Sequence, residues 1–252
     1  MANFVANTQF SIDAIDLGFY IDNIAGSGFE EDSNLTFFGS TYPDRLYVLA
    51  DDGNENRRLD IYGQNITVGF LGTPTGGTIS AVGEFDINAG IQRWYANGFS
   101  ADAVATFNAA TSASTADDIA VIQNALAGAD TITLSALSDV MKGFGGDDTL
   151  KGGGGDDDLD GGAGSDTAIY DPNFAQATIS FEGRCSDSLH PSEGTDRLSG
   201  FEFVNFNGDI RSVVSLLPAN DPPVPVPATA SATEDGAVVT GQLQANDANG
   251  DP

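Results

Sequence analysis

A nine-residue repeat over residues 143–169 limits the folds open to this chain more than any other feature of its sequence. The stretch divides into GFGGDDTLK, GGGGDDDLD and GGAGSDTAI, so glycines, an aspartate and an apolar residue recur in step. The aspartates in register are Asp148, Asp157 and Asp166. Two positions after each stands an apolar residue, namely Leu150, Leu159 and Ala168. A six-residue turn followed by a three-residue strand has this period, and stacked units of this kind build a right-handed parallel β-roll.

Two degenerate units precede the regular ones. ALAGADTIT (residues 125–133) keeps Asp130, and LSALSDVMK (residues 134–142) keeps Asp139. Two units make one full coil, so turns on the same edge of the roll are eighteen residues apart. We therefore expect residues 125–170 to form the roll. One edge should stack Asp130, Asp148 and Asp166, and the other edge should stack Asp139 and Asp157.

The residue types of the repeat suit calcium. Aspartate supplies a hard, charged oxygen, which calcium prefers and which suits zinc or copper poorly. Glycine adopts positive φ at little steric cost and lets main-chain carbonyls approach an ion. If an ion binds between two stacked turns, the repeats offer about three sites. The best lies at Asp148/Asp166, where both turns are glycine-rich, and weaker ones lie at Asp139/Asp157 and Asp130/Asp148, where one turn is degenerate. The glycines expected to line these sites are Gly143, Gly145, Gly146, Gly152, Gly153, Gly155, Gly161, Gly162 and Gly164.

Two other interpretations of this stretch are weaker. A flexible Gly/Asp-rich linker has no reason to keep period nine in both its aspartates and its apolar residues. An EF-hand loop ends on a glutamate, and none lies between Gly143 and Tyr170. The stretch resembles the RTX (repeats-in-toxin, hemolysin-type) calcium-binding repeats, whose consensus is G-G-x-G-x-D-x-U-x with U a large apolar residue. The middle unit fits this consensus at every position, whereas the first has Phe144 for the second glycine and the third has only Ala168 at the apolar site.

Composition restricts the partners and the location of the protein. The chain has 37 acidic and 9 basic residues, a formal charge of −28, which argues against nucleic acid or anionic membrane as a partner. Its one cysteine allows no internal disulfide, and we find no transmembrane segment or Sec-type signal peptide. The RTX resemblance implies a secreted or bacterial cell-surface protein that leaves by type I secretion machinery. We expect residues 1–252 to be the N-terminal part of a longer protein.

Residues 1–112 predict a β-rich, sandwich-like N-terminal domain, and the fold class of the whole chain is mainly β. Strands are expected where β-branched and aromatic residues gather between turn residues, at residues 9–21, 45–50, 58–63, 65–71 and 78–85. Helices are expected at residues 100–110 and 115–128, the second with Thr115 as its N-cap and Gly128 at its end. We expect residues 113–124 to be a helical cap that covers the open end of the first coil and its sheet edge.

Residues 171–217 should close the other end of the roll. GTDRLSGFEFVNFNGD (residues 194–209) resembles a segment common just after RTX repeats, and its aromatic residues suggest two strands. Residues 218–228 form a proline-rich, extended linker. Residues 229–252 resemble the start of a bacterial cadherin-like or VCBS-type adhesin module, an incomplete immunoglobulin-like sandwich. That resemblance implies an inter-domain calcium site with Asp221, Glu234, Asp247 and Asp251.

No catalytic motif is found, so we expect no enzyme within these residues. His190 is the only histidine, which excludes H-E-x-x-H, and no G-x-S-x-G elbow is present. Cys185 and His190 are five residues apart, and an incidental thiol and a surface imidazole explain them more simply than a catalytic pair. Trp94 and Tyr95 could form a sugar-stacking platform, although a tryptophan in the core or at a domain interface is the simpler interpretation.

These features predict a secreted, calcium-dependent adhesin in which Ca2+ drives folding of the roll after export. Two alternatives stay open: the non-catalytic portion of a secreted RTX enzyme, and a carbohydrate-binding N-terminal domain carried on an RTX roll. The expected partners are calcium, the type I secretion machinery and a cell-surface or glycan target.

Overall fold

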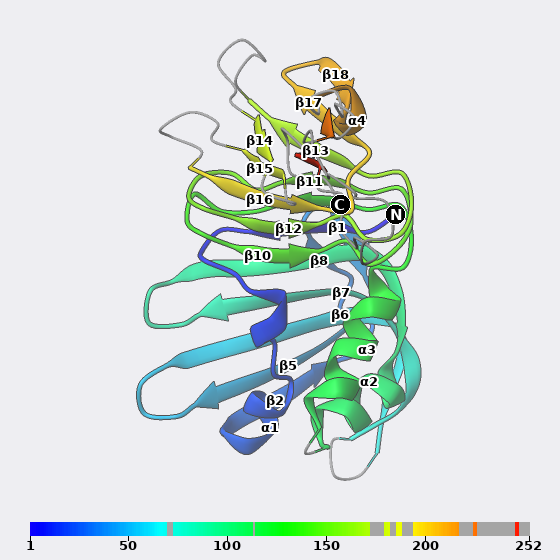
Figure 1. The fold of residues 1–252 in the computed structure, drawn as a ribbon. Coiled ribbons are helices and arrows are strands. Elements are labelled where there is room, and N and C mark those ends of the chain that lie inside the picture. Colours follow the sequence, from blue (N-terminus) through cyan, green and yellow to red (C-terminus); the bar gives the residue numbers. More distant parts are fainter. Residues whose placement is uncertain are drawn as a thin grey trace, which may run out of the picture.

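The computed structural model describes residues 1–69, 73–112, 114–171, 179–181, 185–187, 194–216, 224–225 and 245–246. The protein is mainly β, as the sequence predicts. One sheet of eleven strands runs through both parts of the molecule, with the N-terminal domain at one end and the roll at the other, as Figure 1 shows. None of the helices in the described part of the chain is long and apolar enough to cross a membrane.

Antiparallel strands form the sheet of the N-terminal domain. Their order across the sheet follows the chain: β2 (Ile24–Glu30), β5 (Asp44–Asp51), β6 (Asn56–Val68), β7 (Pro74–Asp86) and β8 (Ile91–Asp102). The strands predicted at 45–50, 58–63 and 78–85 are confirmed. Residues 65–68 continue β6, so the separate strand predicted at 65–71 is wrong.

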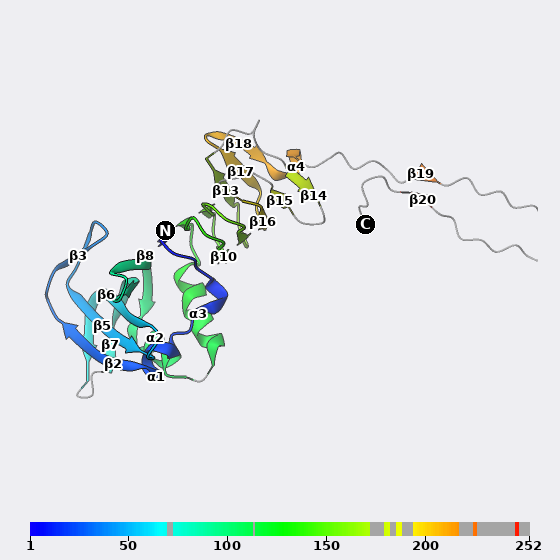
Figure 2. The same ribbon diagram turned by 90° about the vertical axis from the view of Figure 1, so that its left-hand side faces the viewer.

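Short helices cover one face of this sheet, where a sandwich would place a second sheet (Figure 2). They are η1 (Ile12–Ala14), α1 (Gly18–Asp22), α2 (Ala103–Ala110) and α3 (Thr115–Ala125). The strand predicted at residues 9–21 is therefore wrong. Its alternating apolar residues fit a strand locally, but Ile12 and Tyr20 instead become buried from η1 and α1.

The caps of α2 and α3 show how these helices begin. The side chain of Asp102 accepts a hydrogen bond from the Ala105 N–H (2.7 Å), which supplies one of the partners that a helix N-terminus lacks. The N-cap of α3 is Ser114, whose Oγ accepts from the Ala116 N–H (3.2 Å), so the predicted N-cap Thr115 is one residue too late. The C-cap of α3 is Leu126, two residues before the predicted terminator Gly128.

A two-stranded hairpin contributes aromatic residues to a second cluster of the N-terminal domain. It consists of β3 (Leu35–Phe37) and β4 (Ser40–Tyr42), and its Phe37 and Tyr42 bury against Tyr62 of β6. The rings of Phe37 and Tyr62 are stacked with their centroids 4.4 Å apart. In Figure 2 β3 lies on the side of the sheet away from the helices.

The roll has two parallel ladders, as the repeat predicts. One contains β9 (Thr131–Thr133), β11 (Thr149–Lys151) and β13 (Thr167–Tyr170), and the other contains β10 (Val140–Lys142) and β12 (Asp158–Asp160). Thr149 pairs with both Thr131 and Thr167, which is the expected offset of eighteen residues. The apolar repeat positions point into the core and are almost fully buried: Ile132, Met141, Leu150, Leu159 and Ala168.

The N-terminus of the chain forms the first coil of the roll. β1 (Asn3–Ala6) pairs parallel with β9 on one side and antiparallel with β8 on the other, so it joins the two halves of the sheet. Phe4 stands opposite Ile132 and takes the apolar position of a repeat, and Ser11 bridges Val140 on the second ladder. The prediction that the helix hides the sheet edge is wrong, because β1 pairs with β9 there. The apolar face of α3 does pack at this end of the roll: Ile122 contacts the core, and Leu126, which follows the helix, is buried in it.

Two predicted strands continue the ladders at the other end. β16 (Asp196–Ser199) pairs with β12, and β17 (Phe203–Phe206) pairs with β13. β14 (Ile179–Phe181) and β15 (Cys185–Asp187) extend the first of these edges, and β18 (Asp209–Ser212), followed by α4 (Val213–Leu216), extends the second. Further on, only β19 (Val224–Pro225) and β20 (Ala245–Asn246) are described. The rest of the predicted linker (218–228) and adhesin module (229–252) lies outside the described residues.

Candidate metal centre

Each repeat places its aspartate at the end of its turn, immediately before its short strand, and the turns of the three regular repeats are rich in glycine. The side chains of Asp130, Asp139, Asp148, Asp157 and Asp166 are all 3% exposed or less. They stack as predicted, with Asp130, Asp148 and Asp166 on one edge and Asp139 and Asp157 on the other. Buried carboxylates are costly unless they are paired or hydrogen-bonded, so the partners of their oxygens decide what the turns can do.

One oxygen of each aspartate binds the main chain of the preceding coil. The Asp130 N–H donates to Asp148 Oδ1 (2.8 Å), and the Asp148 N–H donates to Asp166 Oδ1 (2.8 Å). On the other edge the Asp139 N–H donates to Asp157 Oδ1 (2.8 Å). These hydrogen bonds connect successive coils and hold each carboxyl group in a fixed orientation.

The second oxygen is buried without a hydrogen-bond partner at four of the five positions. These atoms are the Oδ2 oxygens of Asp130, Asp148, Asp157 and Asp166. Asp139 differs, because its Oδ2 accepts from both the N–H and the Oγ of Ser135, each at 2.9 Å. A buried acceptor without a donor is unfavourable by about 1–3 kcal/mol, and a bound cation would remove this penalty.

The glycines keep the turns close enough for main-chain oxygens to face these carboxylates. A Cβ on Gly143 would collide with Asp148 Oδ2 and would lie 2.5 Å from the carbonyl oxygen of Gly161 in the next turn. A Cβ on Gly152 would likewise collide with Asp157 Oδ2, and one on Gly161 would lie 2.7 Å from the Asp166 Cβ. Carboxylate and carbonyl oxygens that converge in this way are the ligands that calcium prefers.

The remaining glycines of the site need their backbone freedom or the space of a missing side chain. Positive φ occurs at Gly146, Gly153, Gly155, Gly162 and Gly164. A Cβ on Gly153 would collide with the carbonyl oxygen of Ser135, and one on Gly164 with that of Gly146. Gly145 is different, because its nearest neighbour, the carbonyl oxygen of Ala163, lies at 3.6 Å from a built Cβ. Phe144 keeps the positive φ (68°) of the glycine position that it occupies.

Burial and like charge raise the pKa of the stacked carboxyl groups. Burial raises the pKa of Asp148 to about 7, the hydrogen bond from the Asp130 N–H opposes this rise, and the nearby carboxylates add to it. Burial also raises the pKa of Asp157 to about 7. The pKa values of Asp130, Asp139 and Asp166 are raised for the same first reason. Without a cation, the roll therefore disfavours the charged form that a metal requires.

Two further acids continue the ladders, and the sequence analysis did not assign them to the site. Asp196 Oδ1 accepts from the Asp157 N–H (3.0 Å), and Glu202 Oε2 accepts from the Asp166 N–H (2.7 Å). Both stand in the pattern G-x-[D/E]-x-U-x, as GTDRLS and GFEFVN. That pattern was the available signal, but Asp196 follows Asp166 by 30 residues and Glu202 follows Asp196 by only six, so the two acids do not continue the spacing of nine.

At the opposite end, the chain supplies main-chain donors but no acids. The Ala2 N–H donates to Asp130 Oδ1, and the Phe10 N–H donates to Asp139 Oδ1 (2.5 Å). In the part of the chain that the structure describes, no three His, Cys, Asp or Glu side chains gather into one cluster. An ion between two of these turns would therefore find one or two carboxylates, with carbonyl oxygens and water as further ligands.

Trp94 and Tyr95 do not form the sugar-stacking platform that was considered from the sequence. Trp94 is packed in the core, where its ring stacks on Phe4 with centroids 5.9 Å apart, and its Nε1 donates to Glu84 (2.8 Å). Tyr95 contacts Phe38 instead, so the two residues do not form one platform. Cys185 lies in β15, whereas His190 is outside the described residues. Asp221, Glu234, Asp247 and Asp251 are also outside them.

Comparison with known proteins supports calcium binding by the roll. A family model described as the RTX calcium-binding nonapeptide repeat (4 copies) matches residues 135–168. A search of curated proteins found no match to the chain. The matched segment includes the degenerate unit around Asp139 and the three regular units, so this part of the chain consists of RTX calcium-binding repeats. Proteins that carry such repeats are typically secreted.

Proposed function

We propose that this protein is a secreted RTX-type adhesin component in which Ca2+ completes the folding of the β-roll after export. The observation that carries the proposal is the set of four buried Oδ2 oxygens that lack a hydrogen-bond partner. Gly143 and Gly152 leave room beside two of these oxygens, those of Asp148 and Asp157, and the segment matches a calcium-binding repeat. Calcium would be held by Asp148 and Asp166, by Asp157 with Asp139, and by Asp130 with Asp148, about three sites in all.

Electrostatics explains why folding should depend on the ion. Two carboxylates about 5 Å apart repel each other by roughly 3 kcal/mol at an effective dielectric constant of 20. A calcium ion between them reverses the sign of this interaction. Extracellular calcium modules bind with dissociation constants of roughly 10⁻⁴ to 10⁻³ M. The sites would therefore stay empty inside a cell and fill outside it, which couples folding to export.

Residues 229–252 support the adhesin role through their resemblance to a cadherin-like or VCBS-type module. In this proposal the N-terminal domain and roll are non-catalytic and precede such modules. Beads coated with the protein should adhere to a target cell surface in millimolar calcium and detach in excess EDTA. Adhesion that is the same with and without calcium would contradict a calcium-dependent adhesin, while leaving calcium binding by the roll untouched.

Calcium titration of the chelated protein tests the metal sites. We expect β-type circular dichroism and melting temperature to rise as calcium is added. The double variant Asp148→Ala/Asp166→Ala should lose most of this response, because both turns of the best pair lose their carboxylates. The matched control is Asp51→Ala/Asp52→Ala, which removes two exposed acids of the N-terminal domain. An equal response from the two variants would show that calcium acts through general charge screening and not through the roll.

A further inference from the structure

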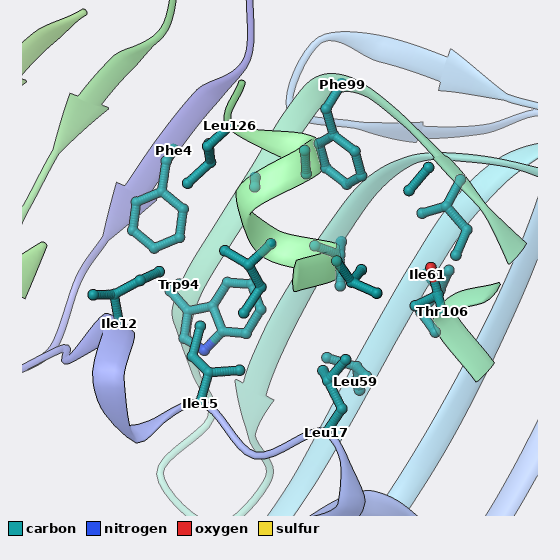
Figure 3. Close-up of a pocket in the computed structure, with 17 residues that line it drawn as sticks. Phe4, Ile12, Ile15, Leu17, Leu59, Ile61, Trp94, Phe99, Thr106 and Leu126 are labelled. Atoms are coloured by element: carbon teal, nitrogen blue, oxygen red, sulfur yellow. The ribbon is translucent and has the colours of Figure 1, made fainter. Parts of the chain in front are cut away.

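Two adjoining apolar cavities lie between the N-terminal sheet and its helices, away from the calcium-binding turns. Their volumes are about 90 Å³ and about 250 Å³. Figure 3 shows the smaller one, with Trp94 and Phe4 at one end and Thr106 and Ile61 at the other. The two cavities share five lining residues: Leu17, Leu59, Ile61, Ile79 and Thr106. The two cavities are therefore neighbours that share part of their lining, and we call them the smaller and the larger lobe.

The lining selects an apolar occupant. No charged side chain lines either lobe. Thr106 stands where the lobes meet, and its hydroxyl already donates to the Asp102 carbonyl oxygen of its own helix (2.8 Å). An apolar cavity of about 150 Å³ stays dry and takes up benzene or xenon, and buried water needs two to four polar partners. The larger lobe exceeds that size, so water fills it poorly and a hydrocarbon fills it well.

The larger lobe is bordered by a residue that is exposed to solvent. Ile24, at the start of β2, lines this lobe and is 53% exposed, although most isoleucines are buried. Ser27 of the same strand, which is exposed, and Thr73, which is half-buried, also line it. Polar atoms are thus confined to the lobe nearest the solvent, and the smaller lobe beyond Thr106 is lined by apolar side chains throughout its remaining surface.

We propose that the N-terminal domain binds one alkyl chain that carries an uncharged head group. The chain would lie along the two lobes past Thr106, with the head group beside Ile24. Two small adjoining cavities, in place of one wide cavity, favour a chain over a compact ring system. A carboxylate head group would be repelled, because the chain as a whole carries −28 and the exposed Asp22 lies two residues before Ile24. A cationic head group would find no carboxylate in the lining of either lobe, so the head group is uncharged. This site does not depend on the calcium-binding role of the roll.

Calorimetric titration with a series of straight-chain alcohols tests the proposal on the intact protein in calcium. We expect one ligand per chain, measured for octan-1-ol, decan-1-ol and dodecan-1-ol below their solubility limits. Affinity should rise roughly fourfold per added methylene while the chain still enters the cavity, and then level off. Decanoate should bind more weakly than decan-1-ol. No binding by any alcohol, several ligands per chain, or equal affinity for decanoate and decan-1-ol would overturn the proposal.

Two variants of α2 test whether the alcohols bind in the cavity or on the protein surface. Thr106→Phe places a large side chain where the lobes meet, so affinity should level off at a shorter alcohol. Asn108→Phe adds the same side chain at an exposed position of the same helix and should leave the profile unchanged. Identical profiles for both variants would show that the alcohols bind elsewhere. If Thr106→Phe does not fold, the stoichiometry and the length limit of the unaltered protein decide the question alone.

Discussion

Replacing Asp148 by asparagine should have opposite effects with and without calcium. Asparagine keeps the oxygen that accepts from the Asp130 N–H (2.8 Å) but exchanges the unpartnered Oδ2 for an amide nitrogen. The nitrogen carries no charge and cannot bind a cation. The substitution therefore removes the metal ligand while it preserves the connection between the two coils.

The size of each effect follows from the surroundings of the carboxyl group. Its pKa is raised from 3.8 to about 7, so keeping it charged at pH 8 is unfavourable by at most about 4 kcal/mol. If the uncharged asparagine removes half of this penalty, the Asp148→Asn variant is about 2 kcal/mol more stable than the natural protein in excess EDTA. Its melting temperature is then higher by roughly 4–8 °C. A site at a hundred times its dissociation constant adds about 2.7 kcal/mol. Asp148 borders two such sites, so in calcium the variant should be less stable than the natural protein.

Thermal melts followed by circular dichroism, in EDTA and in saturating calcium, measure both signs. The control is Asp51→Asn, which changes an exposed carboxylate and should shift neither melt by a comparable amount. A variant that is less stable in both conditions would mean that Oδ2 has a structural role that the geometry does not show. A variant that is more stable in both would mean that no ion binds at Asp148.

Four further predictions follow from the geometry. Calcium binding should release protons near neutral pH, because the pKa values of Asp148 and Asp157 are about 7 in the absence of the ion. The calcium affinity should therefore fall roughly tenfold from pH 8 to pH 6 for each aspartate that titrates. Calorimetry in two buffers of different ionisation enthalpy measures the number of protons released. Since these pKa values exceed the unfolded value of 3.8, the stability of the calcium-free protein should be greatest in acid and should decline as the pH rises through 7. A melting temperature in EDTA that rises with pH would contradict this expectation. Gly164→Ala should destabilise the calcium-loaded protein more than Gly90→Ala does. Both glycines have positive φ, but only a Cβ on Gly164 would collide with the main chain of the preceding coil. Equal melting temperatures of the two variants would refute this close approach of the coils. Phe4→Ala should lower the free energy of unfolding by about 3–5 kcal/mol and should lower the melting temperature of the roll together with that of the N-terminal domain, because Phe4 lies in the core that both share. Two separate melting transitions would contradict the shared core.

Local pattern was a good guide where contacts repeat at a short interval. The period of nine predicted strands at the x-U-x positions, and Thr149 pairs with Thr131 and Thr167 as that period requires. It was a poor guide at residues 9–21, where alternating apolar residues suggested a strand and the chain forms η1 and α1. Alternation over so few residues is compatible with either structure, and packing against the sheet decides between them.

The candidate site divides in the same way. Spacing alone placed the five repeat aspartates and the glycines in their turns. It missed Asp196 and Glu202, because their alignment with Asp157 and Asp166 follows from the pairing of β16 with β12 and of β17 with β13, which the repeat spacing does not predict. The sequence also does not predict the different roles of the two carboxylate oxygens. Nothing in a repeat indicates that Oδ1 binds the preceding coil and that Oδ2 does not.

The amino-acid sequence by itself determined the β-roll, its two edges and the acidic stack, because each unit contacts units at a constant distance along the chain. Tertiary structure decided what bounds that roll. Asn3–Ala6 inserts between β8 and β9, whose paired residues lie at least 88 residues away along the chain, and makes the roll and the N-terminal domain a single sheet. Such a pairing depends on two edges that exist only after both parts have formed, so no local pattern encodes it.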